Sequence, residues 1–137
     1  MEDIGARNGV RFIDDSKATN LASMLAALKM VTGRVRLIAG GLPKNESFAP
    51  ACPILAEKVS GVYLIGKAAD EMAAAWRNVV PCHLCGTLEK AVEEAWSDAV
   101  PGEIILLSPA CASFDQFRSF EERGNVFRRL FESLDRR

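Results

Sequence analysis

The stretch FIDDSKATN, residues 12–20, changes character within a few positions. It starts inside the apolar run 10–13 and ends at Asn20, just before an apolar helical pattern that begins at Leu21. Two carboxylates, a serine, a lysine and a threonine lie in between. A strand that ends in a short turn and continues into a helix is the repeating unit of an α/β fold. The stretch therefore predicts such a unit, with an unusual number of hydrogen-bonding groups in its turn.

The rest of the chain repeats this alternation. Short apolar segments predict strands at residues 10–13, 35–39, 62–65, 79–82 and 104–107. Helical patterns cover residues 21–31, about 50–59, 67–77, 87–99 and 119–134, with Asn20 and Thr87 as expected N-caps. The strand segments do not alternate apolar with polar residues, which is typical of strands covered on both faces. The sequence predicts an α/β fold: a Rossmann-like, mostly parallel sheet of five to six strands with helices on both faces.

Composition and charge narrow the class of protein. The chain has 137 residues, 49% of them apolar, which suits one domain with one core. A net charge of −1 gives no electrostatic reason to expect a nucleic acid or a membrane as partner. No apolar run approaches the roughly 20 residues of a membrane helix, and the acidic start lacks the apolar core of a signal peptide. We expect a cytoplasmic protein.

The cysteines raise a separate possibility. Cys82 and Cys85 form a C-x-x-C, the spacing of a thioredoxin-like redox pair or of half a zinc site. A redox pair would normally open a helix, whereas this one follows an apolar run and is expected at a strand end and loop. No second paired-ligand motif completes a zinc site. We expect unrelated, reduced thiols and no bound metal, and keep a thiol redox protein as an alternative.

Polar groups collect after three of the predicted strands. They lie in the first turn (residues 14–20, DDSKATN), the second turn (residues 40–45, GGLPKN) and the third turn (residues 108–115, SPACASFD). Ligands of open α/β sheets bind beyond the carboxyl ends of the strands, so we expect these turns to meet at one edge. Lysines, hydroxyls, helix starts and a Gly-Gly pair that admits close backbone approach suit an anion with more than one negative group. Each turn alone is more often ordinary capping or a solvated loop, but together they indicate a binding site.

The motifs of a complete enzyme do not occur in this sequence. There is no G-x-x-x-x-G-K-[ST] phosphate loop and no G-x-G-x-x-G after a strand. A G-x-S-x-G elbow and a histidine–carboxylate pair are also missing. The three turns therefore predict half of an active site, one that binds an anion without specifying a reaction.

The same turns resemble a known family. DDSKATN at 14–20, IAGG followed by Lys44 at 38–44, and LLSPACASFDQFRSFEERG at 106–124 are similar to the C-terminal domain of Mur ligases. Within the family they resemble most the branch that adds D-glutamate to UDP-N-acetylmuramoyl-L-alanine (MurD). The resemblance runs from about Gly9 to the end of the chain. It implies a D-glutamate-binding domain at residues 9–137, with residues 1–8 as the end of an interdomain segment.

The resemblance implies a function in peptidoglycan synthesis. A whole ligase of this kind has a UDP-binding domain, a central ATPase domain and the present domain. ATP activates the carboxylate of UDP-N-acetylmuramoyl-L-alanine as an acyl phosphate, and the amine of D-glutamate attacks it. ATP and Mg²⁺ are expected mainly in the central domain, and this domain is expected to hold D-glutamate and to close on the nucleotide. The chain alone should be inactive.

The resemblance also assigns residues to the substrate. By position, Thr19 and Lys44 match the residues expected to hold the α-carboxylate of D-glutamate. Ser113 and the region of Phe120 match those expected to hold its side-chain carboxylate. Phe114 takes a hydrophobic position beside Ser113.

Two further positions are implied on the nucleotide side. Lys17 matches a lysine near the substrate and the phosphates and is the expected catalytic residue, and Asp15 matches an acidic residue near the nucleotide. The chain departs from the family in the second turn, where Pro43-Lys44-Asn45 replaces the common Asp-Lys-Gly, so a different pose of this loop is expected. A free-standing module that binds a small anion without catalysis is the alternative.

Overall fold

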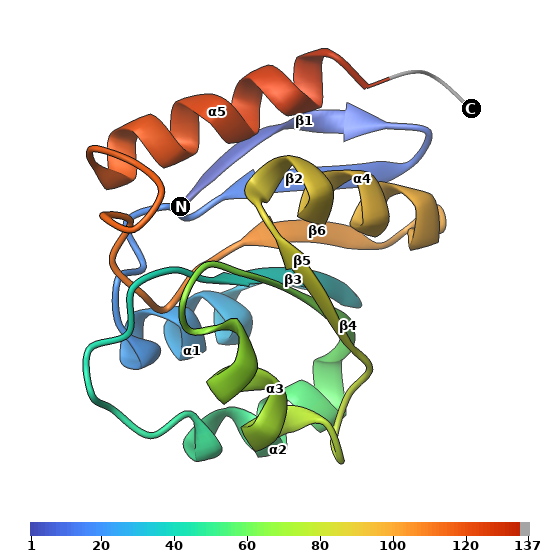
Figure 1. The fold of residues 1–137 in the computed structure, drawn as a ribbon. Helices are drawn as coiled ribbons and strands as arrows, with labels where there is room; N and C mark the ends of the chain where they lie inside the picture. Colours follow the sequence, from blue (N-terminus) through green and yellow to red (C-terminus); the bar gives the residue numbers. More distant parts are fainter. Residues whose placement is uncertain (135–137) are drawn as a thin grey trace.

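A six-stranded sheet runs through the middle of the molecule (Figure 1), in a computed structural model that describes residues 1–134. The strand order is β1-β2-β6-β3-β4-β5. β1 pairs antiparallel with β2, and all other neighbours are parallel, which confirms the predicted sheet. The strands are β1 (Glu2–Arg7), β2 (Val10–Asp14), β3 (Val35–Gly40), β4 (Val59–Ile65), β5 (Cys82–Gly86) and β6 (Ile104–Leu107).

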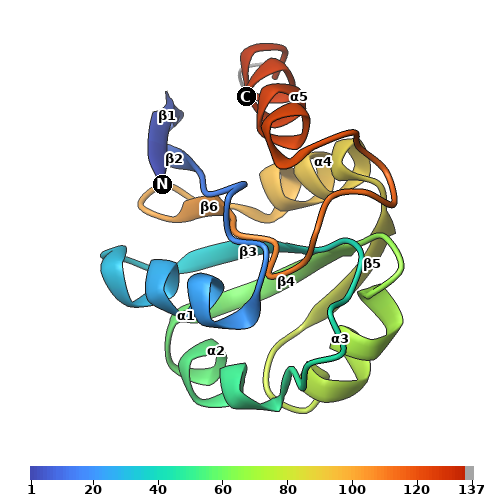
Figure 2. The same ribbon diagram turned by 90° about the vertical axis from the view of Figure 1, so that its left-hand side faces the viewer.

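Helices cover both faces of the sheet, as predicted (Figure 2). One face carries α1 (Leu21–Met30), α2 (Cys52–Lys58) and α3 (Ala69–Trp76), and the short 3₁₀ helix η1 (Ala49–Ala51) precedes α2. The other face carries α4 (Leu88–Asp98) and α5 (Phe120–Glu132). Two apolar cores result, one on each side of the sheet. Every residue of β6 is buried between them, which explains why the strand segments show no polar alternation.

Side-chain caps set the starts of three helices. Asn20 accepts a hydrogen bond from the Ser23 N–H at the start of α1 (2.9 Å), and Thr87 accepts one from the Lys90 N–H at the start of α4 (3.3 Å). Both caps were expected from the sequence. Ser119 caps α5 in the same way, so the N-terminal end of α5 lies close to the third turn.

The first strand was not expected from the sequence. The segment 1–8 was assigned to the end of an interdomain segment, yet Glu2–Arg7 forms an edge strand of the sheet. Its sequence EDIGAR has three charged residues and none of its six residues is buried, so it has little hydrophobic pattern of its own. Tertiary contacts hold it instead: it pairs with β2, and Phe131 of α5 packs so closely over Gly5 that a Cβ there would lie 2.9 Å from the ring.

The fifth strand lies later than expected. The apolar run 79–82 predicted a strand, but β5 spans Cys82–Gly86. Val79 and Val80 instead donate backbone hydrogen bonds to Trp76 O and so close the end of α3. Cys82 and Cys85 therefore lie within the strand, and the prediction that they lie at a strand end and in a loop is wrong.

Candidate functional site

The three polar turns meet at one edge of the sheet because their strands are neighbours. β2, β6 and β3 lie next to one another in parallel, so their carboxyl ends point the same way. The first, second and third turns follow these ends and come together at the left of Figure 1. The expectation that residues far apart in the sequence would share one edge is confirmed.

Backbone hydrogen bonds join the turns directly. The Ala110 N–H of the third turn donates to Ala18 O of the first turn at 2.8 Å. Leu42 of the second turn and Ala112 of the third turn form a two-way bridge, with N–H···O distances of 2.9 and 3.1 Å. The three turns therefore form one hydrogen-bonded unit.

The glycine pair of the second turn serves this packing. Gly40 and Gly41 both have positive φ, and a Cβ on Gly40 would lie 2.0 Å from Ile65 O. A Cβ on Gly41 would lie 2.4 Å from Ala112 O in the third turn. The sequence suggested that these glycines admit a ligand, but in the structure they let the second turn approach β4 and the third turn.

Four predicted ligand residues offer donors that the protein does not use. Among residues 1–134, the side chains of Lys17, Thr19, Lys44 and Ser113 form no hydrogen bond or ion pair. Ser113 is the most informative, because only 2% of the residue is exposed. Its hydroxyl oxygen is not among the fully enclosed atoms that lack a partner within residues 1–134, so a ligand or a water can reach it and accept its hydrogen bond.

The second turn presents Lys44 to solvent. Lys44 is exposed, and the next residue, Asn45, has a φ of 57°, a left-handed conformation that asparagine tolerates better than most residues. Asn45 stands where the resemblance led us to expect glycine, so the change from glycine preserves a backbone that needs positive φ. Directly after this turn, the Glu46 carboxylate accepts a hydrogen bond from the Leu21 N–H at 2.7 Å.

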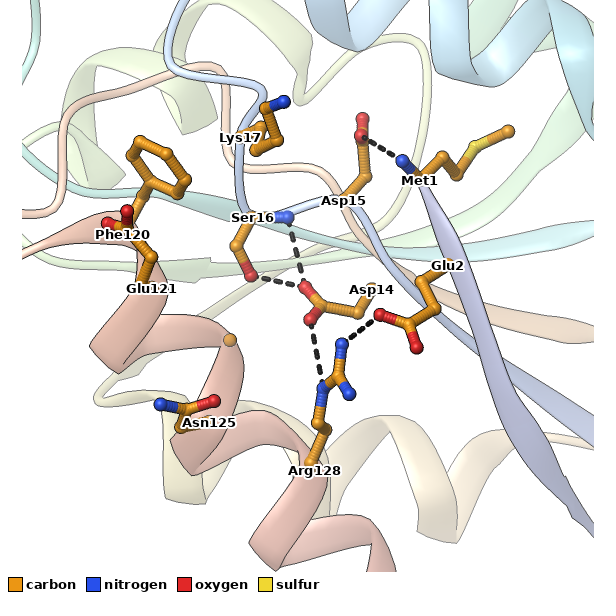
Figure 3. Close-up of a pocket in the computed structure, with 11 residues that line it drawn as sticks. Met1, Glu2, Asp14, Asp15, Ser16, Lys17, Phe120, Glu121, Asn125 and Arg128 are labelled. Carbon is orange, nitrogen blue, oxygen red and sulfur yellow. Dashed lines mark hydrogen bonds and ion pairs between the residues drawn. The ribbon is translucent and has the colours of Figure 1, made fainter.

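A cavity of about 210 Å³ opens between the first turn and the start of α5. Asp15, Lys17 and Phe120 line it together, and Figure 3 shows Lys17 between the other two. The other four predicted ligand residues do not line it: Thr19, Lys44, Ser113 and the exposed Phe114. Six of the seven residues thus lie on the three adjacent turns and Phe120 lies at the start of α5, but only three of the seven line this cavity.

Asp14 shapes the first turn. Its carboxylate accepts hydrogen bonds from both the N–H (3.0 Å) and the hydroxyl of Ser16, and Arg128 Nε lies 3.5 Å from its other oxygen (Figure 3). Gly124 makes this possible, because a Cβ there would lie 2.7 Å from Ser16 Oγ and 2.8 Å from Asp14 Oδ2. Sequence reasoning did not single out Asp14 or Gly124. The Asp-x-Ser spacing could have pointed to Asp14, because an aspartate carboxylate often accepts a hydrogen bond from the backbone N–H two residues later.

Asp15 connects the first turn to the end of β6. Its N–H donates to Leu107 O at 2.7 Å, and its carboxylate accepts a hydrogen bond from the Ser108 hydroxyl at 2.9 Å. Burial raises the pKa of Asp15, and the Ser108 hydrogen bond partly offsets the rise. The carboxylate therefore holds two turns together at the side of the cavity.

The two cysteines of the C-x-x-C do not form a functional pair. Cys82 packs against the core beneath α3, whereas Cys85 packs against the core beneath α4, on the opposite face of the sheet. Burial raises the pKa of both thiols, that of Cys85 to about 12. Two partly buried, poorly ionised thiols on opposite faces do not suit redox exchange or a shared metal ion, so the structure argues against the redox alternative.

The described residues suggest neither a metal centre nor a membrane span. Within residues 1–134, no three His, Cys, Asp or Glu side chains are grouped so as to hold a metal ion, and we assign no Mg²⁺ ligand to this chain. None of the helices in this part of the chain has the length and hydrophobicity needed to cross a membrane.

Comparison with known proteins gives a consistent result. The family model described as "Mur ligase, glutamate ligase domain" matches residues 1–111. A UDP-N-acetylmuramoylalanine–D-glutamate ligase of Myxococcus xanthus is 47% identical over 134 residues, covering 98% of this chain and 30% of that protein. A ligase of the same name from Chlamydia felis is 44% identical over 135 residues, covering 98% of this chain and 32% of that protein. The chain therefore spans about a third of the length of these relatives.

A solved structure shares the fold. It is a domain assigned to a UDP-N-acetylmuramate:L-alanyl-gamma-D-glutamyl-meso-diaminopimelate ligase of Haemophilus ducreyi. The TM-score is 0.61 at 15% sequence identity, and the match covers 94% of this chain and 98% of that one. At this identity the likeness supports the architecture alone.

Proposed function

Since the chain belongs to the Mur ligase family, as a glutamate ligase domain, we propose that it holds D-glutamate for ATP-dependent ligation to UDP-N-acetylmuramoyl-L-alanine. This reaction is a step of peptidoglycan synthesis. One observation carries the proposal: three hydrogen-bonded turns at one sheet edge present two lysines and two hydroxyl groups that have no partner among residues 1–134. Relatives of about 45% identity that are named for this reaction support it.

D-Glutamate matches these donors because it carries two carboxylates. Thr19 and Lys44, from the first and second turns, are assigned to the α-carboxylate. Ser113 and the start of α5 at Phe120 are assigned to the side-chain carboxylate, where the positive end of the helix adds attraction. A hydrogen bond to a charged group contributes roughly 1.5–3 kcal/mol, so a few such contacts give useful affinity for a small amino acid.

Lys17 is assigned to the reacting end of the substrate. Its ammonium group is exposed beside the cavity, close to Asp15 and Phe120 (Figure 3). A lysine at this place would stabilise negative charge on the acyl phosphate while the D-glutamate amine attacks. ATP supplies that phosphoryl group, and we propose that ATP and Mg²⁺ are held chiefly by parts of a longer ligase that this chain does not contain. Closure of this domain on the nucleotide is part of the same proposal.

A chimeric enzyme tests the function. The C-terminal third of the Myxococcus xanthus ligase is replaced by this chain, and phosphate release is measured with ATP, Mg²⁺ and UDP-N-acetylmuramoyl-L-alanine. We expect phosphate release that depends on D-glutamate and is not supported by L-glutamate. The 137-residue chain alone should release none, because its sequence has no phosphate loop.

A binding measurement on the isolated chain tests the proposal even if the chimera does not fold correctly. D-Glutamate is titrated into the ¹⁵N-labelled chain, and amide chemical shifts are followed with L-glutamate as the control. We expect shifts concentrated in the three turns and at the start of α5. A folded chimera without activity, together with a chain whose turns do not respond to D-glutamate, would contradict the proposal.

A further inference from the structure

One buried charged side chain at the site has no role in the function proposed above. Arg123 lies near the N-terminal end of α5 and is 0% exposed, yet no carboxylate within residues 1–134 forms an ion pair with it. Its Nη2 donates to Ser16 O at 2.8 Å, and its Nη1 donates to Cys111 O at 3.1 Å. Its Nε is buried and has no hydrogen-bond partner in the described part of the chain. Two backbone carbonyls therefore take the place of the usual acidic partner.

The two carbonyls belong to different turns of the candidate site. Ser16 lies in the first turn, next to Lys17, and Cys111 lies in the third turn, two residues before Ser113. The second turn is also close, because a Cβ on Gly41 would lie 3.4 Å from Nη1 of Arg123. One guanidinium group thus lies where all three turns meet.

Arginine suits this position better than other residues of its size. Its planar group presents donors at fixed angles, so it can reach two carbonyls on separate turns at once. Burial has a cost, which is visible as a pKa of Arg123 lowered to about 10, but the group stays charged near neutral pH. An apolar residue would avoid that cost and would leave the carbonyls of Ser16 and Cys111 buried without donors.

We propose that Arg123 is a positioning residue of the D-glutamate site. Its guanidinium group sets the separation of the first and third turns, and with it the separation of Thr19 from Ser113. Its buried positive charge adds to the attraction for a ligand with two carboxylates. The identity of the ligand rests on the proposed function, whereas the coupling of the turns does not depend on it.

Hydrogen exchange tests the coupling without any ligand. The reporters are the amides of Ala110 and Ala112, which donate to the first and second turns. Arg123→Met is compared with Lys58→Met, a matched control: Lys58 Nζ also donates to two carbonyls, Leu28 O (2.6 Å) and Val31 O, but at the far end of α1. We expect Arg123→Met to speed exchange of the two reporters about tenfold more than Lys58→Met. Equal exchange in the two variants would overturn the positioning role.

Ligand binding and a conservative variant complete the experiment. D-Glutamate affinity should fall about tenfold in Arg123→Met, stay unchanged in Lys58→Met, and be partly restored in Arg123→Lys, which keeps the charge but not the planar group. If Arg123→Met does not fold, Arg123→Lys is compared with wild type, and unchanged reporter exchange and affinity would overturn the inference. Absence of D-glutamate binding by wild type would refute the proposed function alone, because the exchange comparison still decides the role of Arg123.

Discussion

Replacing Ser113 by alanine should separate ligand recognition from folding. The residue is 2% exposed, and its hydroxyl has no partner within the described chain, so its removal breaks no hydrogen bond of the protein. The free energy of unfolding should therefore change by less than about 0.5 kcal/mol. For bound D-glutamate, the side-chain carboxylate loses one donor in a partly dry site, which costs roughly 1–3 kcal/mol, or about 5- to 150-fold in kcat/KM. We therefore expect Ser113→Ala to lower kcat/KM for D-glutamate strongly and to change the free energy of unfolding little.

The assay compares two amino acids in the chimeric ligase. kcat/KM is measured for D-glutamate and D-glutamine with the wild-type sequence and with Ser113→Ala, and the Tm of both proteins is recorded. The loss should be largest for D-glutamate, because the neutral amide of D-glutamine depends less on the donor. Equal losses for both amino acids, or a fall in Tm of several degrees, would show that Ser113 shapes the third turn and does not read the charge of the ligand.

Three further predictions concern other parts of the structure. Lys44→Ala should raise the KM for D-glutamate about tenfold or more in the chimera with the Tm unchanged; an unchanged KM would mean that this lysine only faces solvent. Gly124→Ala should lower the free energy of unfolding by about 1–3 kcal/mol in denaturant titrations, because its Cβ would lie 2.7 Å from Ser16 Oγ; an unchanged midpoint would contradict this packing. Burial opposes ionisation of Glu103, but a backbone N–H and the Arg36 guanidinium hold its pKa below the ordinary value. The ionised Glu103 should therefore contribute fully to stability above about pH 4.3. This contribution should be lost as the pH falls through the lowered pKa, and Glu103→Gln should remove that part of the pH dependence of Tm.

The sheet was predictable because its central strands carry a strong signal. Runs such as Ile104–Leu107 are apolar at every position, and the turns after them have the composition of ligand loops. The rule that ligands bind at the carboxyl ends of parallel strands then placed three distant turns together. β1 lacked such a signal, because Glu2–Arg7 is polar and is held by β2 and α5 rather than by a hydrophobic face of its own.

The sequence indicated the candidate donors of the site but not the residue that supports them. Lys17, Lys44 and Ser113 stand in turns with a characteristic sequence, so their type and spacing were informative. Arg123 stands in the polar stretch EERGN of a helix, where an arginine normally faces solvent. Its burial depends on two carbonyls contributed by turns that come near only in the folded chain, and no local pattern encodes such a contact.

The position of β6 has a consequence for how the site comes into being during folding. β6 is the last strand within residues 1–134, yet it lies between β2 and β3, with Phe12 paired to Ile105 on one side and Leu37 paired to Leu106 on the other. Contacts between residues so far apart in sequence form slowly, because a long loop must close first. Until β6 inserts, β2 and β3 each present an unpaired edge that can bind another chain. We therefore expect the three turns to take up their relative positions late in folding, and we expect a chain that ends before β6 to lack the candidate site and to be prone to aggregate.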